Sequence, residues 1–266
     1  KRNGYLMIIN GEGIAESMYT DLAVQREGIT HPIKLGIVVG TNDPVIESFV
    51  RIKTRAAARL GVEIVREEIP EGAATAAAVA ALTRLVPLVD GVIVQLPLPA
   101  QINTDAVLAT IPPEKDVDGI STVPVVRPPV AEAVAEIIRR ERIDIQGTQA
   151  VVVGSGRLVG APCAVLLKEL GAQVTVINKG ESLNPLKDAG IVVLGAGEPA
   201  FIKPEMLKDG VILIYAGTSE AGGKVIGDAY PACADKAALF TPVPAGVRPI
   251  AVAFISQPPV PLTAAK

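Results

Sequence analysis

The sequence contains a single histidine, His31, and only two cysteines, Cys163 and Cys233. One histidine and two scattered cysteines form no recognisable metal-binding cluster, and they leave no credible Ser-His-Asp or Cys-His arrangement for nucleophilic catalysis. Two cysteines are also far too few for a disulfide framework, and no charged segment followed by an apolar export segment opens the chain. We therefore expect no bound metal ion and a reducing compartment, which for a bacterial-type enzyme is the cytoplasm.

An excess of basic residues and long apolar runs are absent as well. Lysine and arginine together number 25 against 28 aspartates and glutamates, for a net charge of -3, so no broad basic field exists to hold nucleic acid or an anionic membrane. Hydrophobic residues make up 49% of the chain, yet no uninterrupted run approaches the roughly 20 apolar residues of a membrane-spanning helix. The expected partners are small molecules or further subunits.

The sequence does contain a repeated alternation of short β-rich runs and helical patterns. Strands are predicted over 33–40, 62–69, 91–99, 189–197 and 210–217, with helical stretches such as 47–61 and 71–86 between them. Strands separated by helices predict βαβ units and parallel sheets with right-handed crossovers. The fold class is therefore α/β.

The chain is long enough for two domains. A proline-dense stretch over 111–129 divides the pattern and is either a linker or part of a site. We expect a first domain over 1–125, on which a C-terminal helix at 249–266 packs back, and a Rossmann-like domain over 140–245. The site would lie in the cleft between them.

A lysine interrupts the apolar face of the predicted helix over 47–61. At roughly 100° per residue, Lys53 shares a face with Phe49, Ala57 and Leu60, while the arginines gather on the opposite side. Lys53 is either a snorkelling lysine with its ammonium in water, or a partly desolvated amine with a lowered pKa that can transfer protons near neutral pH. The helix alone leaves both interpretations open.

A glycine turn follows a β-branched run in the second half of the chain. Gly154, Gly156 and Gly160 stand between that run and a helical pattern, the context in which a dinucleotide phosphate binds. The spacing is looser than the standard fingerprint, and a tight turn with nothing bound is the alternative. At the end of the next strand, Asn178 and Lys179 favour a 2′-phosphate and hence NADP over NAD, although Lys179 is equally explained as a solvated strand end.

Two further polar positions accompany Lys53 in the first half. Gln95 stands at the C-terminal end of a buried strand, and Asp116 and Asp118 occupy a loop. Ligands bind at the ends of parallel strands. The alternatives are that Gln95 satisfies loop amides and that Asp118 caps a turn before Gly119.

These segments resemble the bifunctional methylenetetrahydrofolate dehydrogenase/methenyltetrahydrofolate cyclohydrolase family. The resemblance rests on the Lys53 helix, on DGVIVQLPLP over 90–99, on PPEKDVDG over 112–119, and on the segments GSGRLVGAP and TPVPAGVRP. It runs through nearly the whole chain and implies a homodimer that acts on tetrahydrofolate one-carbon substrates with NADP or NAD.

The resemblance also implies roles for individual residues. The catalytic set would be Lys53, Gln95 and the folate-anchoring Asp118. Substrate would contact Phe49, Pro244, Gly246 and Val247. Cofactor would contact Gly154, Ser155, Gly156, Arg157, Val159, Asn178, Lys179, Gly217 and Thr218.

The chain departs from the family pattern at several of these positions. Phe49 replaces the usual tyrosine and loses its hydroxyl, while the serine of the glycine turn is displaced from Gly156 to Ser155. Thr218 falls in a segment where the family has a different sequence, and Arg248 takes the place of a glycine. We therefore expect a divergent member of the family, with departures at both the substrate and the cofactor positions.

The expected function has two steps. Hydride transfer from 5,10-methylenetetrahydrofolate to NADP⁺ gives the methenyl cation, and hydrolysis of that cation gives 10-formyltetrahydrofolate. Lys53 would gain and lose the proton in the hydrolysis, Gln95 would orient the amine, and Asp118 would accept hydrogen bonds from the pterin. Two alternatives stay open: a cyclohydrolase that has lost the dehydrogenase, and a non-catalytic regulatory paralogue that binds nucleotide or folate.

Overall fold

The computed structural model describes residues 6–221 and 224–257 of the chain. The chain forms two compact units. One comprises Glu16–Pro129 together with the segment from Val252 onward, and the other runs from the start of the chain to Ala15 and includes Val130–Ala251. The α/β fold with two domains is confirmed. The boundaries 1–125 and 140–245 stay predictions, and residues 258–266 of the predicted C-terminal helix lie outside the described residues.

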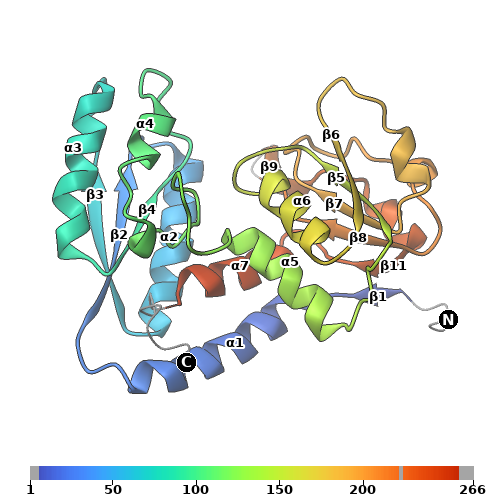
Figure 1. Ribbon diagram of the computed structural model, residues 1–266, viewed down its shortest axis with the longest axis horizontal. Coiled ribbons are helices and arrows are strands. Elements are labelled where there is room, and N and C mark those ends of the chain that lie inside the picture. The colour runs from blue at the N-terminus through green and yellow to red at the C-terminus, as the bar shows by residue number, and fades with distance from the viewer. Residues whose placement is uncertain (1–5, 222–223, 258–266) are drawn as a thin grey trace. The chain divides into compact units, whose positions relative to one another are not determined.

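The unit that contains Glu16–Pro129 is built on a three-stranded parallel sheet with the order β3-β2-β4. The strands are β2 (Ile33–Val39), β3 (Val62–Glu68) and β4 (Gly91–Val94), and they are joined by helices α2 (Pro44–Arg59) and α3 (Thr75–Leu85). Figure 1 shows α2 and α3 on opposite sides of this sheet. Burial on both faces explains why β2 is almost entirely apolar.

Strand β4 ends earlier than its sequence predicts. The strand stops at Val94 instead of reaching Pro99, although the Gln95 amide still donates to the carbonyl of Val38 at 2.9 Å. Pro97 and Pro99 have no N–H to continue the ladder. Gln95 therefore stands at the carboxyl end of a short buried strand, and the chain continues into α4 (Thr104–Leu108) and the 3₁₀ turn η2 (Pro113–Lys115).

The unit that contains Val130–Ala251 holds a six-stranded parallel sheet with the order β1-β11-β8-β7-β5-β6. In that order the strands are Met7–Ile8, Ala237–Phe240, Val211–Tyr215, Ile191–Leu194, Gln149–Val153 and Gln173–Ile177. A short antiparallel hairpin, β9 (Thr218–Ala221) with β10 (Lys224–Gly227), follows β8. The core of this unit contains buried residues of β5, β7 and β8, among them Val151, Val192 and Leu213.

The strand order of this sheet defines where a ligand binds. Strand β6 pairs with one side of β5 and β7 with the other, so the chain moves outward from β5 to β6 and then returns past β5 to β7. Helix α6 (Gly160–Glu169) connects β5 to β6. The carboxyl ends of β5 and β7 mark a topological switch point, the usual ligand position in a doubly wound sheet.

The remaining helices are α1 (Gly11–Glu27), α5 (Pro129–Arg140) and α7 (Val247–Ile255). In the described ranges no helix has the length and apolar character required to cross a membrane.

Candidate active site

Two features of helix α2 determine where Lys53 lies: the cap at the N-terminus of the helix and the row of buried residues along one of its faces. The Asp43 carboxylate caps the helix by accepting from the amides of Val45 at 2.8 Å and Ile46 at 3.3 Å, and Pro44 occupies the first turn. Ile46, Val50, Lys53 and Ala57 follow one another at helical spacing, and all but Lys53 are apolar and buried. The lysine therefore projects from the face that packs onto the sheet.

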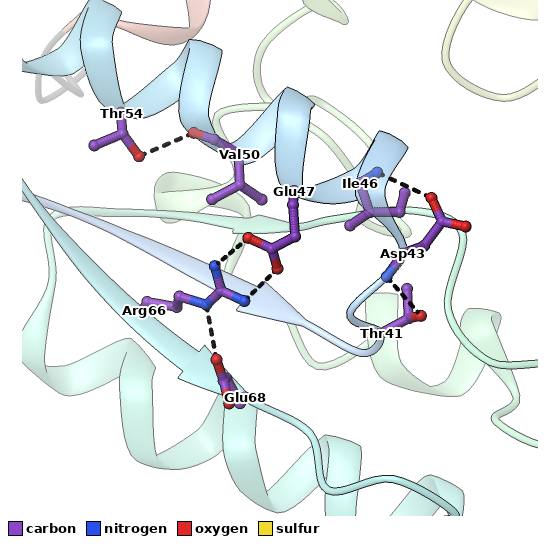
Figure 2. A network of polar contacts seen from close by, with 8 residues as sticks. All are labelled: Thr41, Asp43, Ile46, Glu47, Val50, Thr54, Arg66 and Glu68. Atoms are coloured by element: carbon purple, nitrogen blue, oxygen red, sulfur yellow. Dashed lines mark hydrogen bonds and ion pairs between the residues drawn. The ribbon is translucent and has the colours of Figure 1, made fainter. Parts of the chain in front are cut away.

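A fork of hydrogen bonds fixes α2 against β3. Figure 2 shows Arg66 of β3 donating to both carboxylate oxygens of Glu47, at 2.8 and 2.5 Å. Arg66 also lies 3.1 Å from the Glu68 carboxylate. Such partly exposed pairs stabilise a fold by at most about 1 kcal/mol. Their bidentate geometry still restricts the rotation of the helix that carries Lys53.

Lys53, Gln95 and Asp118 meet at the carboxyl end of β4. The Lys53 ammonium donates to Gln95 Oε1 at 3.1 Å and lies 3.8 Å from Asp118 Oδ2. The side chains of Lys53 and Asp118 are only 13% and 9% exposed. The structure thus places the amine against a neutral acceptor and a carboxylate instead of in open solvent.

The orientation of Gln95 is set by a second hydrogen bond. Its Nε2 donates to the carbonyl of Leu96 at 2.9 Å, which turns Oε1 toward the Lys53 ammonium. An amide cannot titrate, so Gln95 holds the amine in place without adding a charge to the site. The backbone group that Gln95 contacts is a carbonyl and not one of the loop amides of the alternative interpretation, and its role toward Lys53 stays a prediction.

Asp118 has an unusual electrostatic environment. Burial raises the pKa of its carboxyl group, the Lys53 ammonium opposes that rise, and the neighbouring Asp116 carboxylate adds to it. The carboxyl group of Asp118 therefore holds a proton more readily than an exposed aspartate does. A buried carboxyl group of this kind beside an amine is suited to acid–base chemistry on a bound substrate.

Phe49 lies one turn before Lys53 on α2 and is half-buried. Residues four apart on a helix are neighbours on its surface. The ring therefore offers an apolar aromatic face next to the amine, without the hydroxyl that the family pattern has at this position.

The glycine turn between β5 and α6 is packed backbone against backbone. A Cβ atom at Gly160 would lie 1.8 Å from the carbonyl oxygen of Gly154, and one at Gly195 would lie 2.5 Å from Val159 Cγ1. Gly154 also has a φ of +92°, which favours glycine. Glycine is therefore required at positions 154, 160 and 195, because a side chain there would be strained or would clash with the neighbouring backbone or with Val159.

Other residues of the turn face outward. Ser155, Gly156 and Arg157 are exposed, and a Cβ atom at Gly156 would meet no atom within 4 Å. No side chain in the described part of the protein caps the first turn of α6. Open backbone before an uncapped helix start fits the pyrophosphate of a dinucleotide.

Asn178 and Lys179 are exposed directly after β6, beside this turn. The sequence analysis missed Glu181, whose carboxylate accepts from the Asn178 amide at 2.6 Å. An acidic group at the end of this strand is suited to a ribose 2′-hydroxyl, whereas a cation is suited to a 2′-phosphate. Glu181 is only three residues beyond Asn178 in the sequence, but its carboxylate reaches the end of β6 only because the chain turns back there.

A second missed residue is Asp228, which is fully buried. Its Oδ2 accepts from the amides of Ala196 at 2.9 Å and Gly197 at 3.3 Å and so shapes the loop after β7. A Cβ atom at Gly217 would lie 3.0 Å from the same oxygen. Gly217 thus allows β8 to pass close to that loop, and Thr218 begins β9 just beyond it.

The segment after β11 contains the remaining predicted substrate contacts. Val247 is buried, Pro244 is exposed, and the Gly246 amide donates to the carbonyl of Pro242 at 2.7 Å to close a turn. Arg248 is half-buried and makes no ion pair with any described residue, and burial lowers its pKa. Arg248 therefore adds a bulky, half-buried cation to this turn, at a position where the resemblance implies a glycine.

Two sequence-family profiles match the chain. Tetrahydrofolate dehydrogenase/cyclohydrolase, catalytic domain, matches residues 9–118, and the NAD(P)-binding domain of the same family matches residues 128–263. Among curated proteins, the bifunctional protein FolD of Methanospirillum hungatei is 36% identical over 94% of this chain and 95% of its own length. FolD of Thermus thermophilus is 33% identical over 93% of both chains.

Solved structures give the same result. The FolD methylenetetrahydrofolate dehydrogenase/cyclohydrolase from Campylobacter jejuni superposes with a TM-score of 0.89 at 25% identity, over 96% of this chain and 97% of the other. The Trypanosoma brucei enzyme, solved with NADP and an inhibitor, has a TM-score of 0.88 at 28% identity over 95% of each chain. With both domain profiles, full-length relatives and this geometry in agreement, the chain belongs to the tetrahydrofolate dehydrogenase/cyclohydrolase family.

Proposed function

We propose that this chain oxidises 5,10-methylenetetrahydrofolate to the methenyl form with NADP⁺ and hydrolyses the product to 10-formyltetrahydrofolate, with Lys53, Gln95 and Asp118 as the acid–base set. The observation that carries the proposal is the contact of Lys53 Nζ with Gln95 Oε1 at 3.1 Å and with Asp118 Oδ2 at 3.8 Å. All three side chains stand at a sheet end where parallel strands present ligands.

In the hydrolysis, water adds to the amidinium-like carbon of the methenyl cation. Lys53 in its neutral form takes a proton from that water as the C–O bond forms. The resulting ammonium returns a proton to the ring nitrogen as the C–N bond breaks, so one amine serves both steps. The hydroxyl proton of the adduct passes to solvent as the formyl C=O bond forms, and it is the proton that hydrolysis of the cation releases. Gln95 holds the amine through Oε1, and Asp118 accepts hydrogen bonds from the pterin as a carboxylate.

The hydride transfer depends on positioning. Bound NADP⁺ supplies the hydride acceptor. The exposed backbone at Gly156 and the uncapped start of α6 suit its pyrophosphate. Lys179 would attract a 2′-phosphate, in keeping with the NADP bound to the Trypanosoma brucei relative. Phe49, one turn before Lys53, would contact the folate.

A second candidate is a cyclohydrolase without dehydrogenase activity. It is favoured by where the departures from the family pattern fall: Gly156 lacks the serine hydroxyl, and Arg248 brings an unpaired charge to a turn that otherwise has a glycine. Both lie in the unit that contains Val130–Ala251. The acid–base set in the other unit is complete.

An absorbance assay separates these functions, because methenyltetrahydrofolate absorbs near-ultraviolet light and its formation and decay are followed independently. Formation with NADP⁺ together with decay faster than in buffer supports the bifunctional enzyme. Decay alone leaves the cyclohydrolase. Neither signal, with folate binding retained in a calorimetric titration, would contradict both and favour a regulatory paralogue.

We also propose that the enzyme is a homodimer in the cytoplasm. Strand β6 is the last strand in its sheet order, and Val165 and Leu170 near it are exposed apolar residues of the α6 segment. Both cysteine thiols are free and buried, which suits a reducing compartment. Sedimentation equilibrium tests the dimer, and a monomer at micromolar concentration would contradict it.

A further inference from the structure

Asp116 lies in the same loop as Asp118 but belongs to none of the roles above. Its backbone pairs with Val92 in an isolated parallel bridge beside β4. The preceding Lys115 turns away from the site and donates to the carbonyls of Val86 at 2.7 Å and Val89 at 2.8 Å. The start of the loop is therefore anchored against β4 and against the segment just before that strand.

The carboxylate of Asp116 closes this loop. It is 2% exposed, and its Oδ2 accepts from the Ser121 amide at 2.7 Å, five residues further on. Between the two ends, Gly119 has a φ of +63°, and a Cβ atom there would lie 2.6 Å from the Val126 carbonyl oxygen. Asp118 is thus displayed from a loop with little freedom to move.

A loop closure of this kind does not require a charge. A neutral asparagine or serine accepts an amide hydrogen bond equally well. Asp116 Oδ1 is nevertheless buried with no hydrogen-bond partner among the described residues, and so is Ser121 Oγ. Burial of an ionised carboxylate with one oxygen unpartnered is destabilising, and such groups in native proteins call for a functional explanation.

The charged groups around Asp118 are few. Helix α2 contributes Lys53, the loop itself contributes Asp116, and the end of β4 contributes the neutral Gln95. The Lys115 ammonium is engaged by two carbonyls, and Arg127 follows in the segment whose backbone packs on Gly119. Asp116 contributes the negative charge that raises the pKa of Asp118 further.

We propose that Asp116 is a positioning residue for the acid–base set: it closes the loop that presents Asp118 and places a second negative charge beside it, so that a proton is kept within the Lys53–Asp118 pair. The proposal rests on the proposed function, in which Lys53 must deliver a proton to the ring nitrogen. A lone carboxylate beside the amine would retain that proton less firmly against loss to solvent.

The test uses Asp116→Asn, which removes the charge and keeps an oxygen that accepts from the Ser121 amide. The matched control is Ser121→Ala, which removes only the hydroxyl. Without the neighbouring charge Asp118 ionises more easily, so the acid limb of the kcat profile for methenyltetrahydrofolate hydrolysis should move to lower pH in Asp116→Asn and stay in place in Ser121→Ala. A proportional loss of kcat at every pH, with the limb unmoved, would reduce Asp116 to a structural clamp and overturn the proposal.

A second measurement does not depend on activity. Carboxyl ¹³C NMR of aspartate-labelled protein follows Asp118 directly, with its signal assigned by Asp118→Asn. The Asp118 signal should titrate at lower pH in Asp116→Asn than in the wild type, because the neighbouring negative charge is gone. Equal titration of the Asp118 signal in the two proteins overturns the proposal. If Asp116→Asn does not fold, Asp116→Ser takes its place, and if hydrolysis is absent, the proposed function fails while this titration still tests Asp116.

Discussion

At the scale of single residues, Phe49 is a departure whose effect is measurable. It lies half-buried one turn before Lys53, where a tyrosine hydroxyl would lie beside the amine. One hydrogen bond contributes about 1 kcal/mol, or roughly fivefold in rate when it acts on the transition state. The loss is tolerable if Gln95 and Asp118 alone hold the amine.

Phe49→Tyr should therefore raise kcat for hydrolysis about fivefold. The measurement is the decay of methenyltetrahydrofolate at saturating concentration. Phe201→Tyr, in the other unit, is the matched control and should leave kcat unchanged. An unchanged or lower kcat in Phe49→Tyr would show that the hydroxyl has no place in this site.

The residues after β6 set the cofactor preference. Lys179 favours a 2′-phosphate, whereas the Glu181 carboxylate on the Asn178 amide opposes it. Exposed charge pairs contribute up to about 1 kcal/mol. Lys179→Gln should lower the ratio of kcat/KM for NADP⁺ over NAD⁺ by two- to about fivefold, and Glu181→Gln should raise it by a similar factor. The same order should appear in the binding of 2′,5′-ADP against 5′-AMP, and equal ratios in all three proteins would remove both residues from cofactor choice.

At the scale of elements, the β5–α6 turn combines a closed side and an open side. Gly160 packs against the Gly154 carbonyl, whereas Gly156 faces open space. Gly160→Ala should cost roughly 2 kcal/mol or more in stability and weaken NADP binding, because the added Cβ cannot be accommodated without moving the turn. Gly156→Ser should fold normally and strengthen binding, since it restores a hydroxyl. Thermal unfolding and cofactor titration measure both, and normal behaviour of Gly160→Ala would contradict the observed packing.

The elements that could be predicted from sequence are those with local signals. Periodicity places Lys53 on the buried stripe of α2, and the alternation of strands and helices gives both parallel sheets. The meeting of Lys53 with Gln95 spans 42 positions and came only from the family resemblance. Asp228 was not predicted as a site residue because its carboxylate accepts from the amide of Ala196, 32 residues earlier in the chain, and no local sequence pattern indicates such a contact.

At the scale of the whole molecule, buried carboxylates couple stability to pH. Burial raises the pKa of Asp228, while the amides of Gly197, Ala196 and Glu198 oppose the rise. A carboxyl group whose pKa is higher in the folded state stabilises the fold below its unfolded pKa, and this contribution is lost as pH rises through the folded value. Burial also raises the pKa of Asp118, so both groups act in the same direction.

Asp228→Asn should therefore gain stability relative to wild type as pH rises from about 4 to about 7. Urea unfolding at several pH values measures the difference, and Asp209→Asn at an exposed site is the control. A difference that stays constant with pH would mean that Asp228 remains ionised throughout this range.

For the whole enzyme, catalysis of the hydrolysis depends on proton transfer by the partly buried amine of Lys53. The most direct measurement is the decay of methenyltetrahydrofolate with Lys53→Met beside Lys34→Met, the same change at an exposed lysine paired with Glu63. Loss of general acid–base catalysis predicts a decrease of about 10²–10⁴-fold for Lys53→Met, with native circular dichroism and retained folate binding, and no change for Lys34→Met. Wild-type decay rates in Lys53→Met would contradict the account.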